Sequence, residues 1–135
     1  MDFSIPEENK MLQELVAKFV ADELIPLESA VTAREAAGNS SYLTKEELGK
    51  INDRAKALGL FGLDAPEDIG GANLSQQALI GVNEELGYTP VFYTFPPDSP
   101  NLAILLEEGT DAQKKKYVEP LVRGEISTAV MISEP

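Results

Sequence analysis

Adjacent carboxylates recur along the chain, at Glu7-Glu8, Glu46-Glu47, Glu84-Glu85 and Glu107-Glu108. Two carboxyl groups that share a cleft can act as general acid and general base. Most of these pairs fall in predicted capping boxes or on predicted exposed helix faces, where acids have a structural role. We therefore interpret them as structural and expect no catalytic residue in this chain.

The sequence contains no histidine and no cysteine. Histidine is the commonest general base and metal ligand near neutral pH. Thiolates supply many zinc sites and nucleophiles. These absences exclude disulfides, thiolate zinc sites, cysteine nucleophiles and most familiar hydrolytic machinery.

Two charged runs could bind ions. Lys114-Lys115-Lys116 could contact a phosphate, but it lies in the middle of a predicted helix rather than at an N-terminus. The segment from Asp64 to Asp68 offers three acids beside a glycine pair, without the alternating ligand spacing of an EF-hand loop. We interpret the lysines as a solvated stripe and predict no metal site.

Aromatic residues and prolines are concentrated between Tyr88 and Pro100. Such residues on an irregular connection can shape a rigid apolar slot for a ligand. They can equally be ordinary core under a long loop. Composition alone leaves both interpretations open.

The composition indicates one soluble domain. The chain has 135 residues, is 43% hydrophobic and carries a formal net charge of -12, which argues against nucleic acid and anionic membrane surfaces as partners. No signal peptide is visible, and no apolar run approaches the roughly 20 residues of a membrane span. We expect a cytoplasmic protein with no membrane span.

Helical signals dominate the chain up to Gly124. Capping boxes are predicted at Ser4–Glu7, Thr44–Glu47 and Thr110–Gln113, and Pro26 should kink or break the first helix. Further helices are predicted over 27–37, 75–86 and from Pro100 to Gly109. We predict an all-α fold, an up-and-down helical bundle of five or six helices.

The last segment changes character. Residues Ile126 to Ile132 are β-branched and apolar, which favours a strand. A helical domain does not end naturally on one unpaired strand, because its hydrogen-bonding edge would be exposed. We therefore expect a helical domain over 1–125 and, over 126–135, the first strand of a β-domain that continues beyond this sequence.

The order of short motifs resembles the N-terminal domain of the acyl-CoA dehydrogenase family. The resemblance covers essentially the whole chain, and it is specific because all the motifs occur in order at family-like spacing. They are Phe3-Ser4-Ile5-Pro6-Glu7-Glu8, Glu23-Leu24-Ile25-Pro26, Leu58-Gly59-Leu60-Phe61-Gly62-Leu63, Pro66-Glu67-Asp68-Ile69-Gly70-Gly71, Glu84-Glu85-Leu86-Gly87, Gly109 to Tyr117, Pro120-Leu121, Gly124-Glu125 and Val130 to Pro135.

This resemblance implies a flavoenzyme built from a helical, a β and a second helical domain, with FAD between the domains and subunits of a dimer or tetramer. In such enzymes a carboxylate base from the C-terminal domain removes the α-proton of an acyl-CoA, and a hydride passes from the β-carbon to the flavin. An electron acceptor protein is implied as a further partner. Residues 1–135 alone are expected to be inactive and to bind FAD weakly or not at all.

The resemblance also implies site residues. The flavin stretch of the family usually reads aromatic-x-apolar-Thr-Glu-Pro, which places cofactor contacts at Val130, Ile132 and Ser133. Ser133 stands for the usual threonine, and its hydroxyl can still hydrogen-bond a flavin ring edge; Val130 replaces the aromatic residue. The segment from Tyr88 to Pro100 falls where the family builds one wall of its acyl pocket, which makes Phe95, Pro96 and Ser99 candidates for substrate binding.

Two other classes of function compete with acyl-CoA dehydrogenation. Another flavin chemistry on the same fold, in an acyl-CoA oxidase or a flavin monooxygenase, differs in how oxygen meets the reduced flavin. A non-enzymatic acidic helical interaction module would bind no flavin at all.

Overall fold

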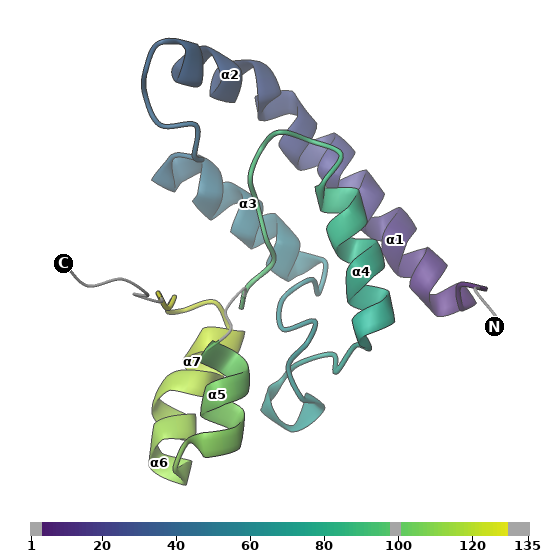
Figure 1. Ribbon diagram of the computed structural model, residues 1–135, viewed down its shortest axis with the longest axis vertical. Coiled ribbons are helices and arrows are strands. Elements are labelled where there is room, and N and C mark those ends of the chain that lie inside the picture. Colours follow the sequence, from purple (N-terminus) through teal and green to yellow (C-terminus); the bar gives the residue numbers. More distant parts are fainter. Residues whose placement is uncertain (1–3, 98–100, 130–135) are drawn as a thin grey trace. The chain divides into compact units, whose positions relative to one another are not determined.

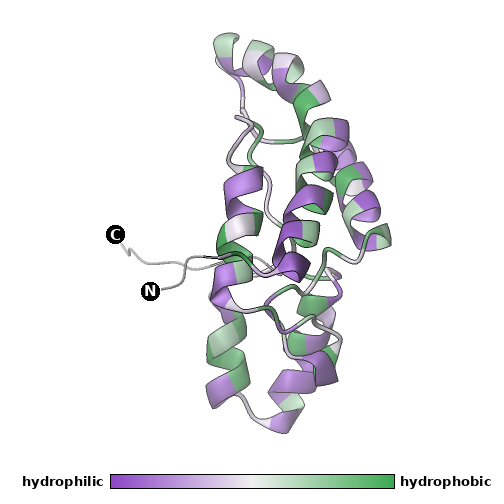
Figure 2. Ribbon diagram, turned by 90° about the vertical axis from the view of Figure 1, so that its right-hand side faces the viewer, coloured by the Kyte–Doolittle hydropathy of each residue, from purple (hydrophilic) through white to green (hydrophobic). Residues whose placement is uncertain are grey.

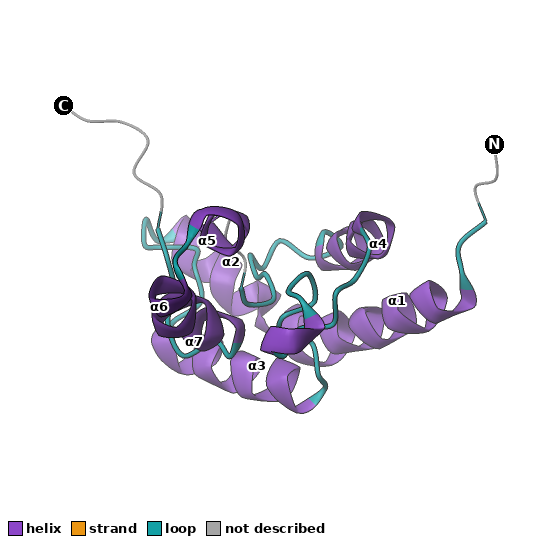
Figure 3. Cartoon of the chain, turned by 90° about the horizontal axis from the view of Figure 1, so that it is seen from below, coloured by secondary structure: helices purple, strands orange, loops and turns teal. Residues whose placement is uncertain are grey.

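The computed structural model describes residues 4–97 and 101–129, so residues 1–3, 98–100 and 130–135 lie outside the description. The described residues form five helical stretches with irregular connections and no strand (Figure 3). The predicted all-α fold is therefore confirmed for this part of the chain. No helix in it is both long and apolar enough to cross a bilayer.

The chain divides into two compact units. Unit 1 comprises Met1–Leu58 and Ser75–Thr94, and unit 2 comprises Gly59–Leu74 and Phe95–Pro135. Each unit has its own buried apolar residues. Figure 2 shows that hydrophobic and hydrophilic residues occupy different sides of the helices, as expected for helices with one buried face.

The first helical stretch of unit 1 is interrupted twice. It consists of α1 (Glu7–Phe19), a π-helical segment η1 (Val20–Leu24), a 3₁₀ turn η2 (Ile25–Leu27) and α2 (Glu28–Ala36). Pro26 lies in the 3₁₀ turn, because it has no N–H to donate to an α-helical ladder. The predicted break at Pro26 is confirmed, whereas the π-helical segment was not predicted.

The start of α1 corrects one prediction. The N-cap residue is Pro6 and makes no side-chain capping hydrogen bond, so Glu7 is the first helical residue rather than the third. The capping box predicted over Ser4–Glu7 is wrong. Ile5 precedes a proline, and the proline ring disfavours helical backbone angles at the residue before it.

The other two helices of unit 1 begin as predicted. In α3 (Lys45–Ala57) the Thr44 side chain accepts from the Glu47 N–H, and the Glu47 carboxylate accepts from the Thr44 N–H. In α4 (Gln76–Leu86) the Ser75 hydroxyl caps the first turn. Helix α4 packs against α1 (Figure 1). The buried apolar residues come from every helix: Val16, Phe19, Val20, Leu24, Val31, Ile51, Ala55, Ala78, Val82 and Leu86.

Unit 2 is a helical hairpin with a folded loop. The loop carries the 3₁₀ turn η3 (Glu67–Ile69). The hairpin pairs α5 (Asn101–Glu108) with a second stretch formed by α6 (Asp111–Gln113), the π-helical η4 (Lys114–Val118) and α7 (Glu119–Val122) (Figure 1). The capping box predicted at Thr110–Gln113 is confirmed. The core of unit 2 contains Ala65, Leu102, Val118, Leu121 and Val122.

The C-terminal strand stays a prediction. Residues 126–129 have no regular secondary structure, and the remaining residues of the proposed strand lie outside the described part of the chain.

Candidate functional site

The candidate site of the described chain is the segment that follows α4. Residues Tyr88–Thr94, which we call the strap, belong to unit 1, and Phe95–Pro97 continue into unit 2. The strap leaves the end of α4, turns back and crosses α3 (Figure 1). It is irregular throughout, so side chains rather than backbone ladders determine its course.

Burial alternates along the strap. Thr89, Val91 and Tyr93 are buried, whereas Tyr88 and Phe92 are 70% and 64% exposed. This period of two is typical of extended backbone. One set of side chains is therefore ordinary core, as the second interpretation expected, and the other set faces outward. The ligand slot stays a prediction.

Tyr93 anchors the inner side of the strap. Its ring lies 5.8 Å from that of Phe19 on α1, and its hydroxyl donates a 2.9 Å hydrogen bond to Asn52 Oδ1 on α3. Burial raises the pKa of the Tyr93 hydroxyl above its ordinary value. The hydroxyl therefore stays protonated at neutral pH and serves as a donor that ties the strap to α3.

Phe95 and Pro96 lie where the chain enters unit 2. Phe95 is 9% exposed and Pro96 is half-buried. The Pro96 carbonyl accepts a 2.8 Å hydrogen bond from the Gly62 N–H, which fixes this backbone against the folded loop. The third candidate, Ser99, lies outside the described residues, as do the proposed flavin contacts Val130, Ile132 and Ser133.

The glycine-rich motifs of the folded loop have a structural explanation. Gly70 has a φ of 91°, and a Cβ at Gly71 would overlap the backbone carbonyl of Ala65. The Gly62 carbonyl accepts from the N–H groups of Ala65 and Ala72. The acids of this loop belong to no group that could hold a metal ion in residues 4–97 and 101–129. The motif therefore shapes the loop backbone.

The lysine run lies on the π-helical segment η4. Lys116 Nζ is 5.0 Å from the centre of the Tyr117 ring, a cation–π contact. Lys114 and Lys115 border an open hollow of about 450 Å³ whose lining also includes Ile69, Leu106 and Val118. Acids border the same hollow, namely Asp68, Asp111 and Glu119, so it is not a positive site for phosphate.

Most of the paired carboxylates are exposed or engaged in helix starts. Glu46 binds Lys50 at 2.7 Å on the surface of α3, and Glu47 caps the same helix while pairing with Arg34. The pairs at positions 7–8 and 107–108 are exposed. We assign no acid–base role to any of them.

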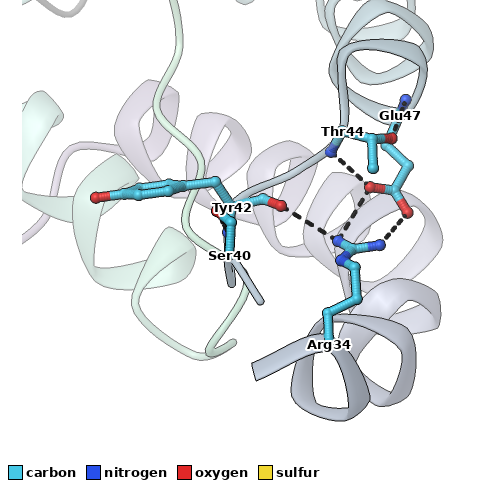
Figure 4. Close-up of polar contacts among 5 residues, drawn as sticks. All are labelled: Arg34, Ser40, Tyr42, Thr44 and Glu47. Atoms are coloured by element: carbon cyan, nitrogen blue, oxygen red, sulfur yellow. Dashed lines mark hydrogen bonds and ion pairs between the residues drawn. The ribbon is translucent and has the colours of Figure 1, made fainter. Parts of the chain in front are cut away.

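An arginine network beside the strap was not foreseen from the sequence. Arg34 on α2 pairs with Glu47 on α3 and also binds the backbone of Tyr42 between the two helices (Figure 4). The partners are 13 and 8 residues apart, too far for a helical i, i+4 pattern to indicate the pairing.

Comparison with known proteins places this helical fold and its ordered motifs in one family. Residues 6–125 match the family described as "Acyl-CoA dehydrogenase, N-terminal domain". The chain belongs to the acyl-CoA dehydrogenase family, and the predicted resemblance is confirmed.

Individual relatives agree with this assignment. The chain is 37% identical to (R)-benzylsuccinyl-CoA dehydrogenase of Thauera aromatica over 100% of its own length and 35% of the relative. It is 32% identical to mitochondrial isovaleryl-CoA dehydrogenase of Pongo abelii over 97% of the chain and 30% of the relative. A solved structure from Mycobacterium abscessus, described as a candidate acyl-CoA dehydrogenase, superposes with a TM-score of 0.74 at 29% identity, covering 92% of this chain and 33% of that one. The chain thus spans about a third of the length of these relatives.

Proposed function

We propose that the protein is an FAD-dependent acyl-CoA dehydrogenase that introduces an α,β double bond into an acyl-CoA thioester, and that residues 1–135 supply part of its substrate and cofactor sites. The observation that carries this proposal is the family match over residues 6–125. Bound FAD would accept the hydride, and the carboxylate base would come from a part of the protein outside residues 1–135. No residue of the chain is assigned as the base.

Within this chain we assign two roles. Phe95, Pro96 and Ser99 form one wall of the acyl pocket, and Val130, Ile132 and Ser133 contact one edge of the flavin. Support for the first role comes from the burial of Phe95 and from the hydrogen bond that holds the Pro96 carbonyl. The second role rests on the resemblance of residues 130–135 to the flavin stretch of the family.

We further propose partners and a setting for the complete protein. These are an acyl-CoA substrate, a second copy or more of the protein in a dimer or tetramer, an electron acceptor protein, and a cytoplasmic location. Several relatives are named for acyl-CoA dehydrogenation, which supports the first of these.

A flavin spectrum tests the reaction. The protein expressed from its complete reading frame should purify with the absorbance of oxidised flavin, and an acyl-CoA substrate should bleach it under anaerobic conditions. Benzylsuccinyl-CoA and isovaleryl-CoA, the compounds in the two relatives' names, begin the substrate panel. Fast reoxidation of the reduced protein by oxygen would instead indicate an oxidase or a monooxygenase, and absence of flavin would favour a non-enzymatic module.

The acyl-pocket role is tested by comparing Phe95 with an exposed apolar residue outside the candidate segment. Phe95→Ala should raise KM for the acyl-CoA by about tenfold, because a shaped apolar wall is lost. Ile80→Ala is the control, since Ile80 lies on α4 outside the candidate segment and is 67% exposed, and it should leave KM unchanged. Equal KM values for both variants would refute the assignment of Phe95. Tight stoichiometric FAD binding by residues 1–135 alone would refute the expectation that this part binds the cofactor weakly.

A further inference from the structure

Arg34 joins two helices through a paired hydrogen bond. Its Nη1 and Nη2 atoms lie 2.9 and 3.1 Å from the two carboxylate oxygens of Glu47. Both side chains are mostly shielded, with 26% and 21% of their surface exposed. The hydrogen bond from Arg34, with that from the Thr44 N–H, lowers the pKa of Glu47 to about 2. The pair is therefore fully charged at neutral pH. Its planar two-bond geometry links α2 to α3 through their side chains.

The same guanidinium holds the loop between the helices. Arg34 Nη2 donates to the Tyr42 carbonyl at 3.3 Å, and the Tyr42 N–H donates to Ser40 Oγ at 3.2 Å. Figure 4 shows the Tyr42 carbonyl directed at Arg34 and the Tyr42 ring directed away from it. Arg34 thus holds the backbone from which the Tyr42 side chain leaves the loop.

The Tyr42 ring meets the outer side of the strap. Its centre is 6.0 Å from that of Phe92, and the two planes form an angle of 83°, an edge-to-face contact. Tyr42 and Phe92 are 67% and 64% exposed, so burial in a core does not hold them in place. Phe92 is followed at once by Tyr93, whose hydroxyl is bound to Asn52. The strap is therefore held on its inner side by Tyr93 and on its outer side by Tyr42.

We propose that Arg34 and Glu47 are positioning residues for the acyl-pocket wall: they orient Tyr42 against Phe92, and this contact fixes the strap that leads directly into Phe95 and Pro96. The inference rests on the proposed function for its effect on substrate. Its structural part, the coupling of Arg34 to the strap, concerns unit 1 alone.

The test uses the protein expressed from its complete reading frame. Arg34→Gln and Tyr42→Ala should each raise KM for the acyl-CoA by roughly twofold to tenfold, the range that corresponds to loss of one aromatic pair. The kcat should stay within about a factor of two, because neither residue touches the reacting atoms. Amide hydrogen exchange over residues 88–94 should accelerate in both variants.

A variant on α3, the helix that carries Glu47, serves as the control. Lys50→Gln removes the exposed ion pair between Lys50 and Glu46, both on α3. It should change neither KM nor exchange over 88–94. A second check is the double variant Tyr42→Ala/Phe92→Ala, whose KM should match that of the more severe single variant because both changes remove one contact.

Two results would overturn the proposal. One is an Arg34→Gln variant in which amide hydrogen exchange accelerates in the loop at residues 38–44 but stays unchanged over residues 88–94. The other is faster exchange over 88–94 with unchanged KM. If Arg34→Gln fails to fold, Arg34→Lys carries the same test, since lysine keeps the charge but cannot form the paired hydrogen bond to Glu47.

Failure of the proposed function would look different. A wild-type protein that no acyl-CoA bleaches contradicts acyl-CoA dehydrogenation and removes the KM readout. The assignment of Arg34 and Glu47 to a substrate pocket then falls with it, whereas hydrogen exchange still decides whether Arg34 fixes the strap.

Discussion

At the scale of single residues, two glycines lie in opposite surroundings. A Cβ at Gly71 would overlap the Ala65 backbone, which cannot rotate away as a flexible side chain could. Gly49 lies inside α3 with nothing near the position of an added Cβ. The first glycine is therefore required by close packing, and the second only weakens a helix.

These surroundings predict effects of opposite sign. Gly71→Ala should lower the free energy of unfolding by about 2 kcal/mol, the usual cost of forcing an extra carbon into packed structure. Gly49→Ala should raise it by up to about 1 kcal/mol, because alanine favours the helix. Urea unfolding of the two variants checks both values. A Gly71→Ala variant as stable as the wild type would show that the loop can open at this point.

The Arg34–Glu47 pair predicts an acid-sensitive contribution to stability. The pKa of Glu47 is lowered from 4.5 to about 2 in the folded protein, first by its hydrogen bond with Arg34. The unfolded chain therefore binds this proton more tightly than the folded one. The stabilisation is complete above about pH 4.5 and is lost as the pH falls towards 2.

Glu47→Gln isolates this effect, because glutamine can still complete a capping box. The difference in unfolding free energy between wild type and Glu47→Gln should shrink as the pH falls from about 4.5 to about 2. Glu46→Gln is the control: Glu46 forms an exposed pair with Lys50 and should show a much smaller pH dependence. A difference curve that is flat between pH 5 and 2 would contradict the charged pair.

At the scale of elements, local signals identified helix starts well. The Thr44 and Thr110 boxes form as predicted, because every partner lies within three residues. The box at Ser4 failed because the proline within it moved the start to Glu7. The π-helical segments η1 and η4 were not foreseen, since the apolar spacing of these stretches also fits an α-helix. The Arg34 network depends on packing between helices, which no local pattern records.

The cap at Thr110 gives an element-scale prediction. Its hydroxyl accepts from the Gln113 N–H at 3.3 Å at the start of α6. Thr110→Ala should destabilise the protein by about 1 kcal/mol, and Thr110→Ser should retain most of the stability. Thr32→Ala, on the exposed surface of α2, is the matched control and should be neutral or slightly stabilising. Chemical denaturation distinguishes these outcomes, and equal losses at positions 32 and 110 would argue against the cap.

At the scale of the whole molecule, the chain is strongly acidic. The formal net charge is -12, and the sequence pI is near 4.3. Mutual repulsion at neutral pH keeps such molecules apart, and the repulsion vanishes near the pI.

The family and the helical class could be predicted from the sequence because their signals are spread over the whole chain. The candidate site could be predicted only as a segment, since which of its aromatic residues are buried depends on α1 and α3.

Solubility tests the charge argument. In low salt, residues 1–135 should reach their solubility minimum close to pH 4.3 and dissolve readily at pH 7. Added salt should raise solubility at the minimum, because it screens attraction between opposite charges. Unchanged solubility from pH 7 to pH 4 would show that net charge does not govern association.

The alternating burial of the strap has a consequence for its length. Buried and exposed residues alternate one by one from Thr89 to Tyr93, so each side chain's burial depends on its position in this alternation. Deleting one residue would turn Val91 or Tyr93 to solvent and bring Phe92 inward, because the buried and exposed sets of side chains would exchange places. Length variation among natural versions of this protein should therefore be rare here and should be concentrated in the loop at residues 38–41, where no such alternation has to be kept.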